Sequence, residues 1–310
     1  MRILITGSTG LIGSHLAPRL VREGYYVIGL TSNTTDRQVS EHRVCDVASP
    51  EAVEAASGAD LLIHLGGLAD ASSSRANPVL YNRINALGTL HMLEAARRSK
   101  SAFVLASTQR IFRPQAQPID EDTHPAPVDP YGYSKLVAEQ WVRMYRSEYG
   151  VPTMILRFFS VYGPGQEVAP GATSGVVTIF LRAALAQRDL FINNHMCRDF
   201  TYAGDVADGI RAAICQPAAW GKTYHIATGV ATHLRDLALT IKEITQSRSR
   251  IVVAGEDGEG ENYVADISRA RDELGYRAGM PLADGVRLYA QWLREHGAGA
   301  AEGAPDQTPA

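Results

Sequence analysis

The feature that most constrains this chain is a glycine-rich segment at residues 6–13, which reads TGSTGLIG. It follows an apolar run at residues 3–5 and opens a helical pattern at residues 14–23. Glycines at this spacing allow a sharp turn, a close approach of the backbone to a pyrophosphate, and packing of helix against strand. The helix N-terminus adds free N–H groups and the positive end of its dipole. A plain tight turn is the alternative, but the position between strand and helix favours a dinucleotide phosphate loop.

Composition excludes several other classes of protein. The 310 residues are 45% hydrophobic and 20% charged, with a formal net charge of −3, which is typical of a folded globular chain. The near-neutral balance argues against a nucleic-acid partner. No apolar run reaches the roughly 18 residues that a membrane span needs. Cys45, Cys197 and Cys215 fit neither a disulfide framework nor a metal site, so we expect reduced thiols, no metal and a cytoplasmic location.

The first half of the chain alternates short apolar runs with helical patterns, which predicts parallel strands joined by right-handed crossovers. The predicted strands cover residues 3–5, 26–30, 61–65, 103–106 and 154–158, and the predicted helices cover residues 14–23, 86–98 and 133–149. This order indicates an α/β fold with a Rossmann-type doubly wound parallel sheet. Ligands of such sheets bind beyond the carboxyl ends of the strands.

After about residue 165 the pattern becomes loop-rich, which predicts a smaller mixed α/β substrate lobe. The predicted helices there cover residues 176–187, 207–216, 234–245 and 285–296, and the predicted strands cover residues 223–227 and 251–254. We therefore expect a dinucleotide-binding domain at residues 1–165, to which segments near 200–229 return. An interleaved substrate lobe would span residues 166–296. The Gly/Ala/Pro-rich tail at residues 297–310 is expected to be disordered.

Tyr131 and Lys135 form a Tyr-x-x-x-Lys pair just after Pro130, a residue that favours a helix start. Positions i and i+4 share one face of a helix, so the phenol and the ammonium can act together. A nearby positive charge lowers the pKa of a phenol, which would let Tyr131 exchange protons with a hydroxyl group. An incidental surface pair is the alternative. Tyr133 is the rival phenol, but it stands on another face than Lys135.

These motifs together resemble the extended short-chain dehydrogenase/reductases, specifically the NAD-dependent epimerase/dehydratase family of nucleotide-sugar enzymes. The resemblance rests on the GxxGxxG spacing, HLGG at 64–67, NALGT at 85–89, the Tyr/Lys pair, RFFSVYGPGQ at 157–166 and RDFTY at 198–202. It covers about residues 1–295. It implies that cofactor contacts come from Gly7, Thr9, Gly10, Leu11, Ile12, Gly13, Thr31, Ser32, Asn33, Arg37, Asp46, Val47, Leu65, Gly66, Gly67, Asn85, Lys135 and Phe158.

The choice between NAD and NADP stays open at this stage. Relatives that prefer NAD usually carry an acid at the end of the second strand, and this chain has Thr31 and Ser32 there. Hydroxyl groups can meet either a ribose or a 2′-phosphate, and Arg37 is near in sequence. We lean slightly towards NADP. For Asp46, whose counterpart in the family contacts the adenine, a helix N-cap is an equal alternative.

The resemblance also assigns residues around the reaction. It implies that Thr108, with Ser107 as its neighbour, hydrogen-bonds the reacting oxygen; a pair of strand-end hydroxyls capping a turn is the alternative. Sugar-nucleotide 4,6-dehydratases carry Asp and Glu next, where this chain has Gln109 and Arg110. That difference argues against such a dehydratase.

For the substrate, the resemblance implies that Arg198 binds a diphosphate, because a guanidinium suits phosphate in geometry and charge. A structural ion pair with Asp199 or Asp205 is the alternative. Ser160 stands where many relatives have a substrate-binding Asn. The acidic segment at residues 256–261 would repel a diphosphate if it faced the site.

We therefore expect an NAD(P)-dependent nucleotide-sugar 4-epimerase that uses Tyr131 as acid and base. The alternatives are an NADPH-dependent reductase of nucleotide-linked 4-ketosugars and, more distantly, a dinucleotide-binding protein without catalysis. The resemblance also implies a homodimer that associates through helices near residues 86–98 and 133–149.

Overall fold

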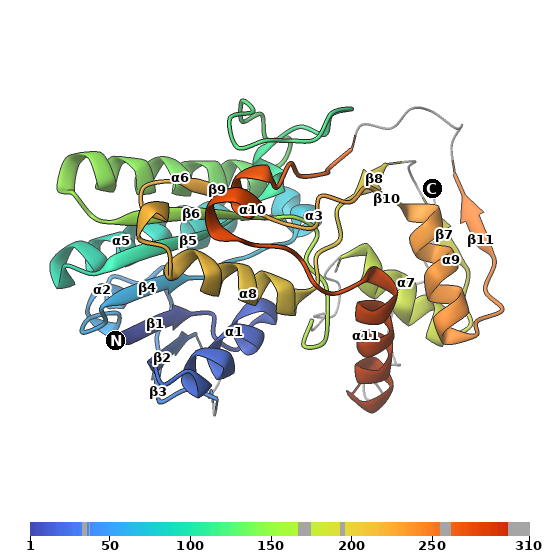
Figure 1. The fold of residues 1–310 in the computed structure, drawn as a ribbon, viewed down its shortest axis with the longest axis horizontal. Helices are drawn as coiled ribbons and strands as arrows, with labels where there is room; N and C mark the ends of the chain where they lie inside the picture. Colours follow the sequence, from blue (N-terminus) through green and yellow to red (C-terminus); the bar gives the residue numbers. More distant parts are fainter. Residues whose placement is uncertain (33–35, 37, 167–174, 193–195, 255–261, 297–310) are drawn as a thin grey trace.

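The computed structural model describes residues 1–32, 36, 38–166, 175–192, 196–254 and 262–296. Within this part of the chain, a seven-stranded sheet has the order β3-β2-β1-β4-β5-β6-β9, and every neighbouring pair is parallel. The strands are β1 (Arg2–Thr6), β2 (Tyr26–Thr31), β3 (Glu41–Val44), β4 (Leu61–His64), β5 (Ala102–Thr108), β6 (Thr153–Phe158) and β9 (Thr223–Ile226). The predicted doubly wound α/β fold is confirmed (Figure 1).

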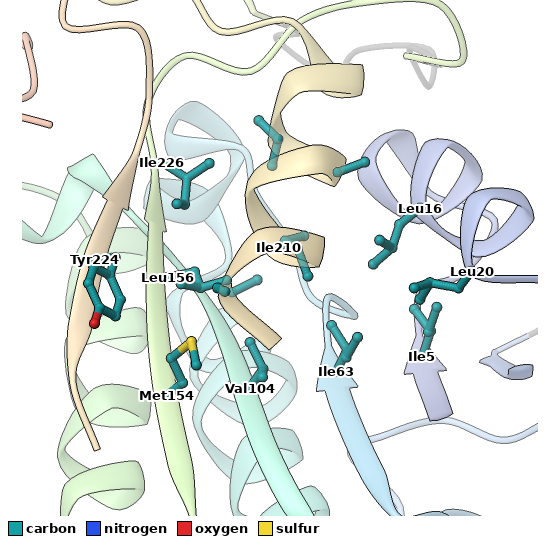
Figure 2. Packing of buried hydrophobic residues seen from close by; sticks show 14 of the residues in the cluster. Ile5, Leu16, Leu20, Ile63, Val104, Met154, Leu156, Ile210, Tyr224 and Ile226 are labelled. Carbon is teal, nitrogen blue, oxygen red and sulfur yellow. The ribbon is translucent and has the colours of Figure 1, made fainter. Parts of the chain in front are cut away.

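Helices cover both faces of the sheet because successive strand residues point to opposite sides. On one face, Ile3 and Ile5 pack with α1 (Leu11–Arg22) and α8 (Ala203–Ile214), as Figure 2 shows for Ile5, Leu16, Leu20 and Ile210. On the other face, Leu4 packs in a second cluster with residues of α2 (Ala52–Ala55), α5 (Gly88–Ser99) and α6 (Pro130–Tyr149).

A separate hydrophobic cluster lies away from the sheet and joins α7 (Val176–Leu185), α9 (Leu234–Thr245) and α11 (Leu282–His296) (Figure 1). The remaining elements are α3 (Ala71–Ala76), α4 (Pro78–Tyr81), α10 (Ser268–Leu274), β7 (Leu190–Ile192), β8 (Cys197–Arg198), β10 (Thr232–His233), β11 (Ile251–Val253), a π-helix (Asn82–Leu87) and two 3₁₀ turns (Gln109–Ile111, Pro217–Ala219). The domain boundaries stay a prediction, as does the homodimer, and residues 297–310 lie outside the described residues.

Several predicted boundaries are wrong, and some short strands were not predicted. The helix expected at 86–98 is continuous with a π-helical turn that begins at Asn82, and the helix expected at 207–216 begins at Ala203. The short strands β7, β8 and β10 were missed because two or three residues carry no periodic pattern and depend on their partners. Among the described residues, no helix combines the length and apolar character needed to cross a bilayer.

A buried ionic cluster connects α6 to β6 beneath the sheet's carboxyl edge. The Glu139 carboxylate accepts hydrogen bonds from Arg157 Nε and Nη2, both at 2.9 Å, and from Arg143 Nη2 at 2.9 Å. Neither Glu139 nor Arg157 is more than 2% exposed. His225 on β9 completes the cluster: its Nδ1 lies 3.1 Å from the Ile119 carbonyl oxygen and its Nε2 lies 3.5 Å from Arg157 Nη1. An uncharged ring, with one donor and one acceptor, satisfies both contacts.

Burial, with the charge of Arg157 as a second cause, lowers the pKa of His225 to about 3. An unfolded histidine titrates near 6.5, so acid protonates the unfolded state first and the folded state loses stability as pH falls from 6.5 towards 3. Between pH 7 and pH 5, we expect the wild type to lose about 2 kcal/mol of unfolding free energy through this histidine. His225→Gln keeps an amide donor but does not titrate, so the variant should not show this loss. Denaturant titrations at both pH values measure this, and an identical pH dependence in the two proteins would contradict it.

Candidate active site

The loop between β1 and α1 has the backbone geometry that a phosphate site needs. Gly7 adopts φ +68°, and its N–H donates to the Leu30 carbonyl at 2.9 Å, while Gly10 N–H donates to Gly7 O at 3.0 Å. A Cβ atom at Gly13 would lie 2.3 Å from Gly7 O and 2.6 Å from Ser8 Cα, so a larger residue cannot fit without moving the backbone. The sequence argument for glycine at 7 and 13 therefore has a steric basis in this structure.

The N-terminus of α1 receives no cap from its own N-cap residue. Gly10 occupies that position and has no side chain to bond the N–H groups of the first turn, which begins with Leu11 and Ile12. Thr9 and Gly10 are exposed, so a ligand can approach the loop from solvent. Free N–H groups at the positive end of a helix dipole suit a pyrophosphate, and the loop therefore fits the dinucleotide that the sequence indicates.

A second loop, after β4, lies directly against the first. Thr6 Oγ1 accepts a hydrogen bond from Gly66 N–H at 2.9 Å and lies 2.7 Å from His64 Nδ1. A Cβ atom on Gly7 would lie 3.0 Å from the Gly66 backbone, and one on Gly66 would lie 3.0 Å from Thr6 Oγ1, so glycine at both positions lets the two loops pack this closely. Leu65 is partly buried against the core. The HLGG segment thus extends the phosphate loop along the sheet edge.

Asn85 ties this second loop to the helix of the Tyr/Lys pair. Its Oδ1 accepts from Leu68 N–H at 2.9 Å, and its Nδ2 donates to Leu68 O at 3.0 Å and to Ser134 Oγ at 2.9 Å. A Cβ atom on Gly67 would lie 2.8 Å from Asn85 Oδ1. The π-helical turn that carries Asn85 gives no sequence signal, and π-helical turns are common at functional sites.

The positions expected near the adenosine are placed at strand ends, and their cofactor roles stay predictions. Thr31 is buried at the end of β2, and its hydroxyl lies 2.8 Å from His42 Nε2, next to the exposed Ser32. Asp46 is exposed after β3, and its Oδ1 accepts from Ala48 N–H at 2.9 Å in a local turn. Val47 is buried at a helix–loop contact with Gly88. Asn33 and Arg37 lie outside the described residues.

Helix α6 presents Tyr131 and Lys135 on its buried side. Asp129 caps the helix by accepting from Gly132 N–H at 2.8 Å, with Pro130 in the first turn. Tyr131 is 9% exposed and lies close enough to the Thr108 hydroxyl for that group to lower the pKa of the phenol, whereas the rival Tyr133 is 58% exposed. The structure therefore places Tyr131 beside Thr108, has Lys135 one turn further along the same buried side of α6, and leaves Tyr133 outside.

The electrostatics of this pair correct one expectation. The sequence suggested that the Lys135 ammonium lowers the pKa of Tyr131, but burial dominates and raises the pKa of Tyr131 to about 12. The Thr108 hydroxyl and the Arg110 charge act in the opposite direction and are outweighed. Burial also lowers the pKa of Lys135 to about 8, opposed by the negative charge of Glu139. Both groups are uncharged more readily here than in water.

Ser107 and Thr108 have different surroundings although they are adjacent. The Ser107 hydroxyl donates to Glu139 Oε1 at 2.6 Å and so belongs to the buried ionic cluster. Thr108 Oγ1 accepts from Arg110 N–H at 3.2 Å, and this hydroxyl lowers the pKa of Tyr131, so Thr108 is the better placed of the two. Sequence reasoning did not single out Glu139. Its signal was an acid four residues beyond Lys135 on the buried face of α6.

The substrate-side positions come from β6 and β8. Arg198 forms no ion pair with Asp199 or Asp205: Asp199 accepts from Thr228 and Gly229 N–H groups, and Asp205 accepts from Met280 N–H. Arg198 Nε is buried without a partner among the described residues. Burial, followed by the charge of Arg110, lowers the pKa of this guanidinium. The alternative of a structural ion pair with either aspartate is wrong, so Arg198 keeps bonding capacity for an anion.

Phe158 is the last residue of β6, and Ser160 lies two residues beyond it. Ser160 has φ +27°, and its Oγ accepts from Gln109 Nε2 at 3.2 Å. Phe158 is buried in the hydrophobic cluster that also contains residues of α1, and in the sheet it pairs with Thr108 of β5. The acidic segment 256–261 lies outside the described residues.

The Gly13 contact gives a direct test of the phosphate loop. We expect Gly13→Ala to push Gly7 and Ser8 out of position, lowering the unfolding free energy by about 1–3 kcal/mol and the dinucleotide affinity by more than about tenfold. Calorimetric titration with NAD and thermal unfolding measure the two effects. Gly279→Ala is the matched control, because Gly279, like Gly13, does not adopt a positive φ, and the atom nearest its Cβ position is 3.9 Å away. Unchanged NAD affinity in Gly13→Ala would contradict the assignment of this loop.

Comparison with known proteins agrees with this geometry. Residues 3–227 match the model of the NAD dependent epimerase/dehydratase family. The chain is 30% identical over 313 residues to the UDP-glucose 4-epimerase of Mycolicibacterium smegmatis, covering 95% of this chain and 99% of that protein. It is similar to the crystal structure of UDP-glucose 4-epimerase with UDP-glucose from Thermotoga maritima (TM-score 0.86, 26% identity, 95% of this chain and 99% of that chain).

A further similar structure is the UDP-glucuronic acid 4-epimerase of Bacillus cereus in complex with UDP-glucuronic acid and NAD, with a TM-score of 0.86 and 25% identity over 95% of this chain and 99% of that chain. That relative holds NAD, so the slight preference for NADP finds no support. The match over residues 3–227 is the decisive one, and this chain belongs to the NAD dependent epimerase/dehydratase family.

Proposed function

We propose that this protein is an NAD-dependent nucleotide-sugar 4-epimerase. The observation that carries the proposal is the burial of Thr108, Tyr131 and Lys135 on a helix that Asn85 connects, through hydrogen bonds to Ser134 and Leu68, to the loop after β4. Support also comes from relatives whose names give UDP-glucose and UDP-glucuronic acid 4-epimerases. Their full-length similarity makes a nucleotide sugar the expected substrate.

The dinucleotide would be held by the Gly7–Gly13 loop, the Leu65–Gly67 loop and Lys135. When bound, NAD supplies the acceptor and donor of a hydride at the sugar carbon. We choose NAD over NADP because the B. cereus relative was solved with NAD and the Thr31 hydroxyl is already bonded to His42. The steric cradle at Gly13 suits the pyrophosphate that both cofactors share.

Tyr131 would carry the proton chemistry. Its phenolate takes the proton from the sugar 4-hydroxyl as that carbon is oxidised to a ketone, and returns it when the ketone is reduced on its other face. A phenol with a pKa of about 12 is a poor source of phenolate at neutral pH, so positive charge must stabilise that form. The Lys135 ammonium and the positively charged nicotinamide ring would supply this charge. Thr108 would hydrogen-bond the same oxygen.

Arg198 would bind the diphosphate, since its buried Nε has no partner among the described residues and neither neighbouring aspartate neutralises it. With Tyr131 at the reacting carbon and Arg198 at the diphosphate, the sugar ring would lie between them. The residues between Tyr131 and Arg198 would then contact the substituents of the sugar ring.

Tyr131→Phe tests the function and the assignment together. Incubated with UDP-glucose or UDP-glucuronic acid, the wild type is expected to form the 4-epimer of one of them without net consumption of NADH or NADPH. Tyr131→Phe should lower kcat by about 10²- to 10⁴-fold, because the proton acceptor is lost, while NAD affinity stays within about twofold. Tyr133→Phe is the matched control and should keep wild-type kcat. Net NADPH consumption at 340 nm would instead support the ketosugar reductase, and unchanged turnover in Tyr131→Phe would contradict the catalytic assignment.

The Lys135 ammonium sets an expected alkaline limit on activity. With a pKa of about 8 in the folded protein, the ammonium is present below that pH and lost above it, so kcat/KM should fall as pH rises through about 8. Glu139→Gln should move this limit to lower pH, because the carboxylate favours the charged lysine. Profiles of kcat/KM between pH 6 and 10 measure it. A limit near pH 10, the range of an unperturbed lysine, would count against this role.

A further inference from the structure

Arg110 stands beside the reacting group, and the proposed function leaves it without a role. It follows Thr108 by two residues, and its backbone N–H donates to Thr108 Oγ1 at 3.2 Å. A Cβ atom on Gly132 would lie 2.1 Å from Arg110 O, so the Arg110 backbone packs directly on the first turn of α6. Arg110 is therefore fixed relative to Thr108 and Tyr131.

One edge of the Arg110 guanidinium is held by a buried acid. Nε donates to Asp129 Oδ2 at 3.0 Å, and Nη2 donates to the same oxygen. The Asp129 carboxylate is fully buried, and its other oxygen caps α6 through Gly132 N–H. A guanidinium has five N–H donors in a rigid plane, so this contact fixes its orientation and leaves donors over.

The other edge remains available. No hydrogen bond is formed by Arg110 Nη1 among the described residues, and the side chain is 23% exposed, so a ligand can reach it. The guanidinium carbon lies 5.5 Å from the centre of the Tyr263 ring. Tyr263 in turn pairs with Arg198 in a parallel bridge, flanked by hydrogen bonds from Asp199 N–H to Tyr263 O and from Tyr263 N–H to Cys197 O.

Arg110 thus lies between Tyr131 and Arg198. The contacts through Thr108 and Gly132 join it to Tyr131, and the contact with Tyr263 joins it to Arg198. The electrostatics agree, because the charge of Arg110 lowers the pKa of both Tyr131 and Arg198. Under the proposed function, the group between the reacting carbon and the diphosphate is the sugar ring.

We propose that Arg110 recognises a carboxylate on that ring, so that the substrate is a nucleotide-linked hexuronate and not a neutral hexose. A guanidinium edge with parallel N–H donors matches the two oxygens of a carboxylate, whereas a hydroxymethyl group offers a single acceptor. The buried Asp129 pre-orients the donors, which reduces the entropy lost on binding. This inference rests on the proposed function and adds the class of sugar to it.

The competing role for Arg110 is purely structural, as the partner that holds the Asp129 carboxylate in place at the helix cap. The two roles differ in their effect on substrates. Loss of a structural partner disturbs Tyr131 and lowers turnover of every nucleotide sugar alike. Loss of a carboxylate receptor lowers turnover of the charged sugar and spares the neutral one.

The experiment compares kcat/KM for UDP-glucuronic acid and UDP-glucose in the wild type, Arg110→Gln, Arg110→Lys and Arg113→Gln. The wild type should favour UDP-glucuronic acid and convert it to an epimer of unchanged mass. Arg110→Gln should lower kcat/KM for UDP-glucuronic acid by about 10- to 100-fold and for UDP-glucose by less than about threefold. Arg110→Lys keeps the charge but lacks the paired N–H donors of a guanidinium, so its kcat/KM for UDP-glucuronic acid should lie between those of the wild type and Arg110→Gln. Arg113, exposed on the same segment, is the matched control and should leave both values unchanged.

A wild type that prefers UDP-glucose, or an Arg110→Gln variant that loses both activities equally, would overturn the inference and leave the epimerase proposal standing. A wild type that epimerises neither sugar would overturn the proposed function and this inference with it. If Arg110→Gln does not fold, the substrate preference of the wild type and of Arg110→Lys still decides between the outcomes.

Discussion

The position of the candidate active site depends on the fully buried ion pair of Glu139 with Arg157. Two charges removed from water are tolerated only when each is paired and hydrogen-bonded, and Glu139 meets this condition through Arg157, Arg143 and Ser107. These partners come from β5, β6 and α6 itself. The pair therefore fixes the position of α6 along the strands of the sheet. It thereby also fixes how far Tyr131 and Lys135 lie from the carboxyl ends of the strands.

Close backbone approach is the second constraint on the site. The phosphate loop and the loop after β4 touch at Gly7 and Gly66, where a Cβ atom on Gly7 would press on the Gly66 backbone and one on Gly66 would press on the Thr6 side chain. Asn85 then hydrogen-bonds both the second loop and Ser134 of α6. Three segments distant in sequence are thereby held as one surface at the carboxyl edge of the sheet, which is where ligands of doubly wound sheets bind.

The same burial that organises the site gives it unfavourable electrostatics for catalysis. Desolvation raises the pKa of Tyr131 and lowers that of Lys135, so each is neutral over a wider pH range than in water. Chemistry at Tyr131 therefore depends on charges brought near it. Glu139 favours the ammonium of Lys135, which makes this buried acid part of how α6 would work.

The sequence by itself determined the parallel α/β architecture, because apolar runs separated by helical patterns leave few other folds. It also identified the glycine loop and the Tyr/Lys pair, whose requirements are local: a turn, a close approach and an i, i+4 spacing. It did not reveal the π-helical turn at Asn85, the short strands β7, β8 and β10, or the commitment of Ser107 to Glu139. Those depend on partners from other parts of the chain. Only the tertiary structure decided that burial sets the direction in which the pKa of Tyr131 shifts, and that Arg198 is not neutralised by Asp199 or Asp205. It also decided that Arg110 lies between Tyr131 and Arg198. Desolvation and pairing are set by what surrounds a side chain in space, and a spacing along the chain does not encode it.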